Sequence, residues 1–128
     1  MKEEQLLKPG ERINQLFSTD IKIIQNREVF SYSVDSVLLS RFPRFPKRGL
    51  IVDFCAGNGA VGLFASSRTQ ARIISVEIQE RLAEMAERSV QLNGLEEQMQ
   101  VICDDLKNMP AHIQGSKVDM ILCNPPYF

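Results

Sequence analysis

The sequence of 128 residues has no tryptophan, a single histidine, and three cysteines that form no Cys-x-x-Cys pair. Because this set lacks the spacing of metal ligands, we predict no metal site. An odd number of scattered cysteines favours reduced, buried thiols at Cys55, Cys103 and Cys123. The lone His112 stands in a polar connection without an acidic partner nearby in sequence, and we expect it at the surface, as neither ligand nor base.

The sequence also lacks a long apolar run and a strong net charge. No stretch approaches the roughly 20 apolar residues of a membrane-spanning helix, and the first ten residues are polar and charged, unlike a signal peptide. The net charge of -1 gives no overall attraction to nucleic acid, so any RNA contact must be local. We therefore expect a cytoplasmic protein without a membrane partner, with one domain's worth of chain that is short for an α/β enzyme.

Apolar runs of strand character alternate with helical segments from residue 50 onward. Strands are predicted over residues 50–54, 72–77, 99–103 and 118–123, and helices over residues 60–66 and 79–92. The second helix has a buried stripe made of Leu82, Met85, Ala86 and Val90, and Asn93-Gly94 ends it. Such alternation predicts an α/β fold with a parallel sheet and right-handed crossovers.

The segment before this sheet has weaker signals. Strand-like runs at residues 21–24 and 28–30 predict a small hairpin, whereas residues 1–12 look loosely attached. Ser33 can cap a helix that ends near Arg41. The inner face of this helix is predicted to consist of Val34, Val37, Leu38 and Phe42.

The segment from Asp53 to Gly62 joins the first strand to the first helix and reads Asp-Phe-Cys-Ala-Gly-Asn-Gly-Ala-Val-Gly. Gly57 and Gly59 are needed where the backbone bends sharply close to a ligand, because a Cβ would restrict φ or fill the space. With Gly62 they match the dinucleotide fingerprint literally, and Glu77 lies where the ribose-binding acid is expected, about 20 residues on. The motif therefore predicts a nucleotide-like cofactor.

The carboxylate of Asp53 favours S-adenosylmethionine over NAD. An acid just before the turn would place like charge near a pyrophosphate, whereas S-adenosylmethionine has no phosphate and carries a cationic amine and a sulfonium. In this interpretation Glu77 accepts from the ribose hydroxyls and Asp104 from the adenine amine, while Asp105 can cap a short turn instead. Asn58 is interpreted as a residue that tolerates left-handed backbone.

A second motif, Asn124-Pro125-Pro126-Tyr127, directly follows the last apolar run. Methyl transfer to a planar nitrogen needs hydrogen-bond acceptors for its N–H groups as the lone pair localises. The side-chain oxygen of Asn124 and the backbone carbonyl of Pro125 can supply these acceptors. The fixed φ of proline holds the backbone at Pro125 steady. Tyr127 can stack on a flat substrate beside Pro126, as extruded bases stack on aromatic side chains. This chemistry needs no strong general base.

The pairing of Asp-Phe-Cys-Ala-Gly-Asn-Gly with Asn-Pro-Pro-Tyr-Phe resembles the S-adenosylmethionine-dependent amino-methyltransferases. It is most similar to the bacterial enzymes that methylate the exocyclic amine of an adenine beside the anticodon of valine tRNA. The resemblance covers most of residues 10–128, and residues 30–40 are similar to the lead-in of those enzymes. It implies a Rossmann-like class I methyltransferase fold, with parallel strands in the order 3-2-1-4 and flanking helices after a small hairpin and helix, S-adenosylmethionine as cofactor and tRNA as partner.

The resemblance also implies roles for residues before the sheet. Tyr32 and Asp35 would close over the methionine end of the cofactor. Purely structural roles are equally good alternatives, with Tyr32 as a packing aromatic and Asp35 as part of the start of a helix. Arg41 and Arg44 belong to a basic cluster that could contact RNA phosphates, although a solvated linker is the favoured interpretation. We divide the chain into a lead-in of residues 1–48 and a partial cofactor-binding domain of residues 49–128.

The chain ends where the second half of such an enzyme would begin, so we expect a fragment or split product that is poorly active alone. Its last strand would be an apolar edge that pairs with the missing half or with another copy. Other targets fit the second motif, namely the glutamine amide of a release factor and the guanine amine of ribosomal RNA. A non-catalytic cofactor-binding module is the alternative from another class, and NAD binding ranks third.

Overall fold

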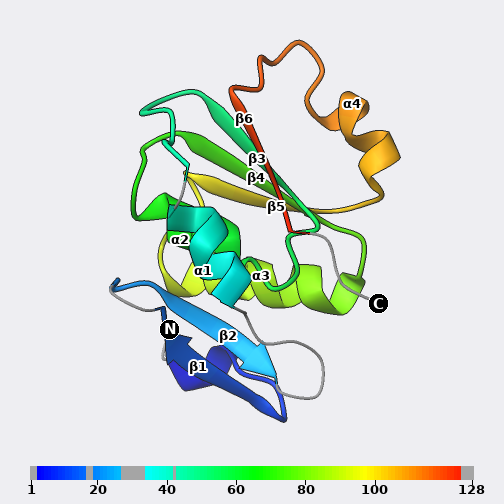
Figure 1. Cartoon of the computed structure of the whole chain (residues 1–128). Coiled ribbons are helices and arrows are strands. Elements are labelled where there is room, and N and C mark those ends of the chain that lie inside the picture. Colours follow the sequence, from blue (N-terminus) through cyan, green and yellow to red (C-terminus); the bar gives the residue numbers. More distant parts are fainter. Residues whose placement is uncertain (1–2, 17–18, 27–33, 42, 125–128) are drawn as a thin grey trace.

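The computed structural model describes residues 3–16, 19–26, 34–41 and 43–124 (Figure 1). Its strands are β1 (Glu11–Gln15), β2 (Lys22–Asn26), β3 (Leu50–Phe54), β4 (Arg72–Glu77), β5 (Met99–Cys103) and β6 (Met120–Cys123). Its helices are α1 (Val34–Arg41), α2 (Ala60–Ser66), α3 (Glu80–Leu92) and α4 (Met109–His112), with short 3-10 helices η1 (Glu3–Leu6) and η2 (Leu106–Asn108). No described helix is both long and apolar enough to cross a membrane.

The main sheet has four parallel strands in the order β5-β4-β3-β6. These are the third, second, first and fourth predicted strands, so the predicted order 3-2-1-4 is confirmed. β3 lies at the centre because it is apolar on both faces, and Leu50 to Asp53 are all buried. The first three strands have the predicted limits, and β6 begins two residues later than predicted.

Each face of the sheet has its own apolar core. On one face Ile51, Ile73 and Met99 pack with Leu63 of α2 and Val90 of α3. Figure 1 shows α1, α2 and α3 on this side of the sheet, between it and the hairpin, with α4 on the other side. The second face has a smaller core made of Leu50, Val52, Ile74, Val76, Ile102 and Met109. The buried stripe predicted for α3 is confirmed.

Gly62 allows α2 to lie close to the sheet. A Cβ at this position would come within 2.8 Å of both the Met99 methyl carbon and the Ser75 hydroxyl. Real Cβ atoms do not approach other atoms so closely, so any larger residue would require the side chains of Met99 and Ser75, or the helix itself, to shift. The third glycine of the motif is therefore a packing glycine.

A small antiparallel hairpin precedes the sheet, as predicted, but one of its described strands, β1, was not predicted. β1 pairs with β2 in antiparallel register, with Ile13 opposite Ile24. The predicted second strand at residues 28–30 lies outside the described residues. β1 has a single apolar residue, Ile13, so its strand signal was weak, and residues 1–12 are wrongly predicted as loosely attached. Glu11, which begins β1, is held by Arg88 of α3.

Two further side-chain predictions were wrong. Leu38 is exposed, and Leu39 packs with Val37 against the core instead. The side chain of Val34 and residue Phe42 are outside the described part. All three cysteines are free, but Cys103 and Cys123 are exposed and Cys55 is half-buried. Cys103 and Cys123 end strands, and Cys55 directly follows one, at an edge of the sheet that is open to solvent.

Candidate functional site

The carboxyl ends of the parallel strands meet at one edge of the sheet. β3 leads to β4 on one side, whereas β6 returns to pair with β3 on the other, so the strand order reverses beside β3. Ligands of open α/β sheets bind at such a switch point, outside the carboxyl ends of the strands. The glycine turn, Glu77, Asp104 and Asn124 all follow or end strands at this edge.

The glycine turn (Cys55–Gly59) follows β3 and enters α2. Gly57 and Gly59 have φ angles of 59° and 90°, which glycine adopts without strain. A Cβ on Gly59 would also lie 3.1 Å from the Ala86 Cβ. Cys55, with φ of 57°, is the one non-glycine residue with positive φ in the described chain. The left-handed geometry expected of Asn58 was therefore wrong.

Glu77 fastens the glycine turn to the start of α3. Its Oε1 accepts a 2.8 Å hydrogen bond from the Gly57 N–H, and its Oε2 accepts a 2.9 Å bond from the Gln79 N–H. Glu77 is buried, and its two backbone bonds orient the carboxylate. Each oxygen keeps acceptor capacity, because an ionised carboxylate has about four lone-pair sites. The sequence predicted a ligand contact for Glu77, but not the two backbone hydrogen bonds by which Glu77 supports the glycine turn.

Asp53 is the most unusual group at this edge. It is 1% exposed, and neither carboxylate oxygen has a well-formed hydrogen bond among the described residues. The pKa of Asp53 is raised to about 8, chiefly by burial and in smaller part by the charge of Glu77, while the Gly62 amide acts in the opposite direction. A buried carboxylate without a partner is costly unless a cation compensates it. Asp53 therefore fits a cationic ligand better than a pyrophosphate.

Asp104 begins a polar network after β5. Its Oδ1 accepts 2.7 Å hydrogen bonds from the Asp105 N–H and the Asn108 side chain, and its Oδ2 lies 2.8 Å from His112 Nε2. The Asn108 bond, together with His112 and the Asp105 amide, lowers the pKa of Asp104 to about 2. His112 is exposed, as predicted, and it has an acidic partner that the sequence did not indicate, because η2 and α4 fold back toward the end of β5. Asp105 caps η2 through the Lys107 N–H, as predicted.

Asn124 lies beside the glycine turn. Cys123 pairs with Phe54 in the β3–β6 register, so Asn124 follows at the level where the turn begins. Cys123 contributes, after burial, to raising the pKa of the Cys55 thiol, which shows that the two chain segments are close. Asn124 is half-buried. The rest of its motif, residues 125–127, lies outside the described residues.

The two arginines predicted to contact RNA do not lie with the residues at this edge of the sheet. Tyr32 lies outside the described part, as does the side chain of Asp35 in α1. Arg41 and Arg44 are exposed, and the Arg41 carbonyl accepts a 2.8 Å bond from Arg68, just beyond the end of α2 that is remote from Gly59. If Arg41 and Arg44 contact a substrate, they contact a region of it that is distant from the glycine turn.

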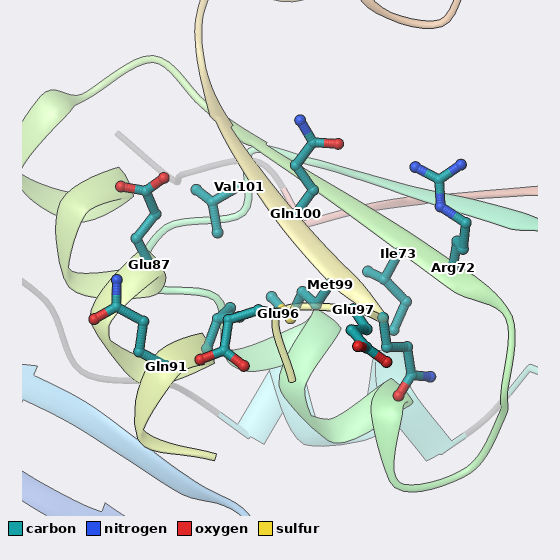
Figure 2. A pocket seen from close by; sticks show the side chains of 11 residues that line it. Arg72, Ile73, Glu87, Gln91, Glu96, Glu97, Met99, Gln100 and Val101 are labelled. Atoms are coloured by element: carbon teal, nitrogen blue, oxygen red, sulfur yellow. The ribbon is translucent and has the colours of Figure 1, made fainter. Parts of the chain in front are cut away.

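A hollow of about 260 Å³ lies elsewhere, along the outer side of β5. Figure 2 shows Glu87 and Gln91 of α3 on one side of β5 and Arg72 on the other. Arg72 begins β4, so the hollow reaches the amino end of the strands, opposite the glycine turn. None of the predicted site residues lines it. Among the described residues, no group of His, Cys, Asp and Glu side chains is arranged to hold a metal ion.

Comparison with known proteins identifies relatives of this arrangement. Residues 20–128 match the family described as "Methyltransferase small domain". The chain is similar to the tRNA1(Val) (adenine(37)-N6)-methyltransferase of Shewanella halifaxensis, with 32% identity over 96 residues that cover 75% of this chain and 39% of the relative. The same enzyme of Bacteroides fragilis is 30% identical over 94 residues, which cover 73% and 40%. The chain thus spans about two fifths of the length of these curated relatives.

Solved structures share the fold. The SAM-dependent methyltransferase from Agrobacterium tumefaciens has a TM-score of 0.71 at 19% identity and covers 94% of this chain and 41% of its own. P. horikoshii TYW2 in complex with MeSAdo has a TM-score of 0.66 at 18% identity, with 79% and 38% covered. At these identities the likeness confirms the Rossmann-like architecture.

Proposed function

The chain belongs to the methyltransferase small domain family, whose cofactor is S-adenosylmethionine, and on this basis we propose that it acts in methyl transfer to the exocyclic amine of an adenine in tRNA. One observation carries the proposal above others. Asn124 follows β6 at the level of the glycine turn, so an amide acceptor for a planar nitrogen lies next to the predicted cofactor site. The tRNA adenine is supported by the relatives at 30% and 32% identity, which are tRNA1(Val) (adenine(37)-N6)-methyltransferases.

The cofactor-binding role is assigned to residues that end the strands. Gly57 and Gly59 let the backbone approach the ligand. The buried Asp53 carboxyl, which keeps its proton in the unliganded protein, would ionise beside a cationic ligand, because a low local dielectric strengthens the attraction between the two charges. Glu77 is proposed to accept from the ribose hydroxyls and Asp104 from the adenine amine. S-adenosylmethionine, when bound, supplies the sulfonium methyl group.

The substrate role is assigned to the second motif. The Asn124 side chain and the Pro125 carbonyl would accept hydrogen bonds from the target amine and hold its nitrogen in line for transfer. Tyr127 would stack on the adenine beside Pro126. This arrangement orients the amine and lets the methylated nitrogen release its proton to water, so no basic side chain is needed.

Further contacts are proposed for the lead-in of residues 1–48, which we separate from the cofactor-binding part at residues 49–128. Tyr32 and Asp35 would cover the methionine end of the cofactor. Arg41 and Arg44 would contact phosphates of the RNA away from the target base. A tRNA substrate would place the protein in the cytoplasm.

The edge of β6 bears on activity. Among the described strands β6 pairs only with β3, and its Ile121 side chain is 57% exposed. An exposed apolar edge strand invites pairing. We propose that further strands or a second copy cover this edge in the active enzyme.

The test is transfer of labelled methyl groups to total tRNA, ribosomal RNA and a release factor, with the chain alone and with the chain extended to the length of its relatives. We expect label in tRNA adenine. Label only in guanine of ribosomal RNA or in the glutamine of the release factor would refute the substrate. Asn124→Ala should abolish transfer and keep cofactor binding, whereas equal transfer by this variant would refute the proposed role of the amide.

A further inference from the structure

One edge of β2 is covered by side chains instead of a strand. β1 pairs with β2 along one edge. Along the other, the Lys22 N–H donates to Asn93 Oδ1 at 2.8 Å, and Asn93 Nδ2 returns a bond to the Lys22 carbonyl at 2.6 Å. The Ile24 N–H donates to Ser89 Oγ at 2.9 Å, and Asn58 Nδ2 donates to the Ile24 carbonyl at 3.2 Å. Two elements of the main domain, α3 and the glycine turn, thus hold the hairpin.

Asn58 connects the hairpin with the glycine turn. It stands between Gly57 and Gly59, is 0% exposed, and does not adopt the positive φ that its neighbours have. Its place in the turn is therefore explained by its side chain, which reaches Ile24. The Ile24 side chain, also fully buried, packs with Leu82 and Met85 of α3. The turn is thus held from two directions, by Glu77 on the side of the sheet and by Asn58 on the side of the hairpin.

The hairpin itself is fastened to α3 at a distance from the turn. Arg88 Nη2 donates to Glu11 Oε2 and to Glu84 Oε2, at 2.7 Å each, and its Nη1 donates to the Leu6 carbonyl at 2.6 Å. A guanidinium that bonds two carboxylates and a backbone carbonyl fixes the orientation of β1 against the helix. The position of Ile24, to which Asn58 bonds, is therefore set by contacts on both sides of the hairpin.

We propose that Asn58 is a positioning residue, through which the docked hairpin holds the glycine turn in the conformation that binds the cofactor. The inference rests on the proposed function, because it takes the glycine turn to be the cofactor site. Loss of the Asn58 bond frees the middle of the turn and leaves the buried Ile24 carbonyl without this donor. Ser89 acts on the same backbone residue from α3, so its loss should loosen the turn without touching the ligand.

The first experiment measures the affinity for S-adenosylhomocysteine by calorimetry in the wild type, Asn58→Ala and Ser89→Ala. We expect binding about tenfold weaker for Asn58→Ala and several-fold weaker for Ser89→Ala. Gln15→Ala is the matched control, because it removes a hydrogen bond to Thr19 in the same hairpin without contacting α3 or the turn, and should bind as the wild type does. Folded variants of Asn58 and Ser89 with wild-type affinity would overturn the proposal.

A second readout separates this proposal from the proposed function. Amide hydrogen exchange in the unliganded protein should be faster for residues 55–60 in Asn58→Ala and Ser89→Ala, with β3 and β4 unchanged. A purely structural role would raise exchange throughout the core equally, and that result would refute the coupling. If the wild type binds no S-adenosylhomocysteine, the proposed function fails, while the exchange pattern still decides whether the hairpin controls the turn. If Asn58→Ala does not fold, Ser89→Ala decides by the same two measurements.

Discussion

Replacing Asp53 by asparagine should remove the loss of stability that the unliganded protein undergoes as the pH rises through the neutral range. Asp53 is buried beneath the glycine turn without a well-formed hydrogen bond, and its pKa is raised from the ordinary 3.8 to about 8. In the folded protein it keeps its proton up to about pH 8, whereas in the unfolded chain it loses the proton near pH 4. The stability that this proton provides is complete below the unfolded pKa and is lost as the pH rises to the folded pKa.

The difference between the two pKa values corresponds to roughly 6 kcal/mol of folding free energy, at about 1.4 kcal/mol per pKa unit. Asparagine has nearly the same shape and no charge, so it does not contribute this pH dependence. Its buried amide carries a cost of about 1 to 3 kcal/mol for unpaired polar groups, but that cost is the same at every pH. The free energy of unfolding of the variant minus that of the wild type should therefore increase as the pH rises.

The assay is urea unfolding of the wild type and Asp53→Asn across the range from about pH 4 to about pH 9. We expect the variant to gain several kcal/mol relative to the wild type over this range, with most of the gain complete by about pH 8. Asp20→Asn, at an exposed position, controls for the removal of one carboxylate. If the free energies of unfolding of the wild type and Asp53→Asn differed by the same amount at every pH, the raised pKa of the buried carboxyl would be refuted.

Three other changes test the supports around the site. Arg88→Met leaves Glu11, whose side chain is 3% exposed, without its partner, and should cost about 3 to 5 kcal/mol in urea unfolding; a loss below about 1 kcal/mol would contradict the role of this ion pair. Gly62→Ala should destabilise the fold by about 1 to 3 kcal/mol in thermal unfolding, because its Cβ meets atoms at 2.8 Å, and an unchanged melting temperature would refute the close packing. In His112→Ala, the pKa of Asp104 measured by NMR should rise from about 2 toward 3.8. An unchanged pKa would show that His112 does not interact with Asp104.

The main sheet could be predicted from the sequence because its signals are local. The strand limits follow from short apolar runs bounded by turns, and the end of α3 follows from Asn93-Gly94. β1 was missed because its sequence, Glu-Arg-Ile-Asn-Gln, has one apolar residue and depends on Arg88, 77 residues away. Tertiary contacts of this kind override weak strand propensity.

The sequence predicted where the candidate site lies, but not the hydrogen bonds that its residues make. The glycine spacing indicated the turn, but the positive φ falls on Cys55 instead of Asn58, whose side chain donates a hydrogen bond to the Ile24 carbonyl. The pairing of His112 with Asp104 depends on the path of a short helix that no local pattern specifies. Sequence reasoning therefore identified residues at the right edge of the sheet, and the structure adds how they support one another.

The glycine turn and Asp53 are proposed to accept the nucleoside and cationic amine of an S-adenosyl compound and to exclude a diphosphate. The most direct measurement is calorimetric titration of the protein with S-adenosylhomocysteine and, separately, with NAD. We predict saturable binding of S-adenosylhomocysteine and none of NAD. Binding of NAD without binding of S-adenosylhomocysteine would contradict the account.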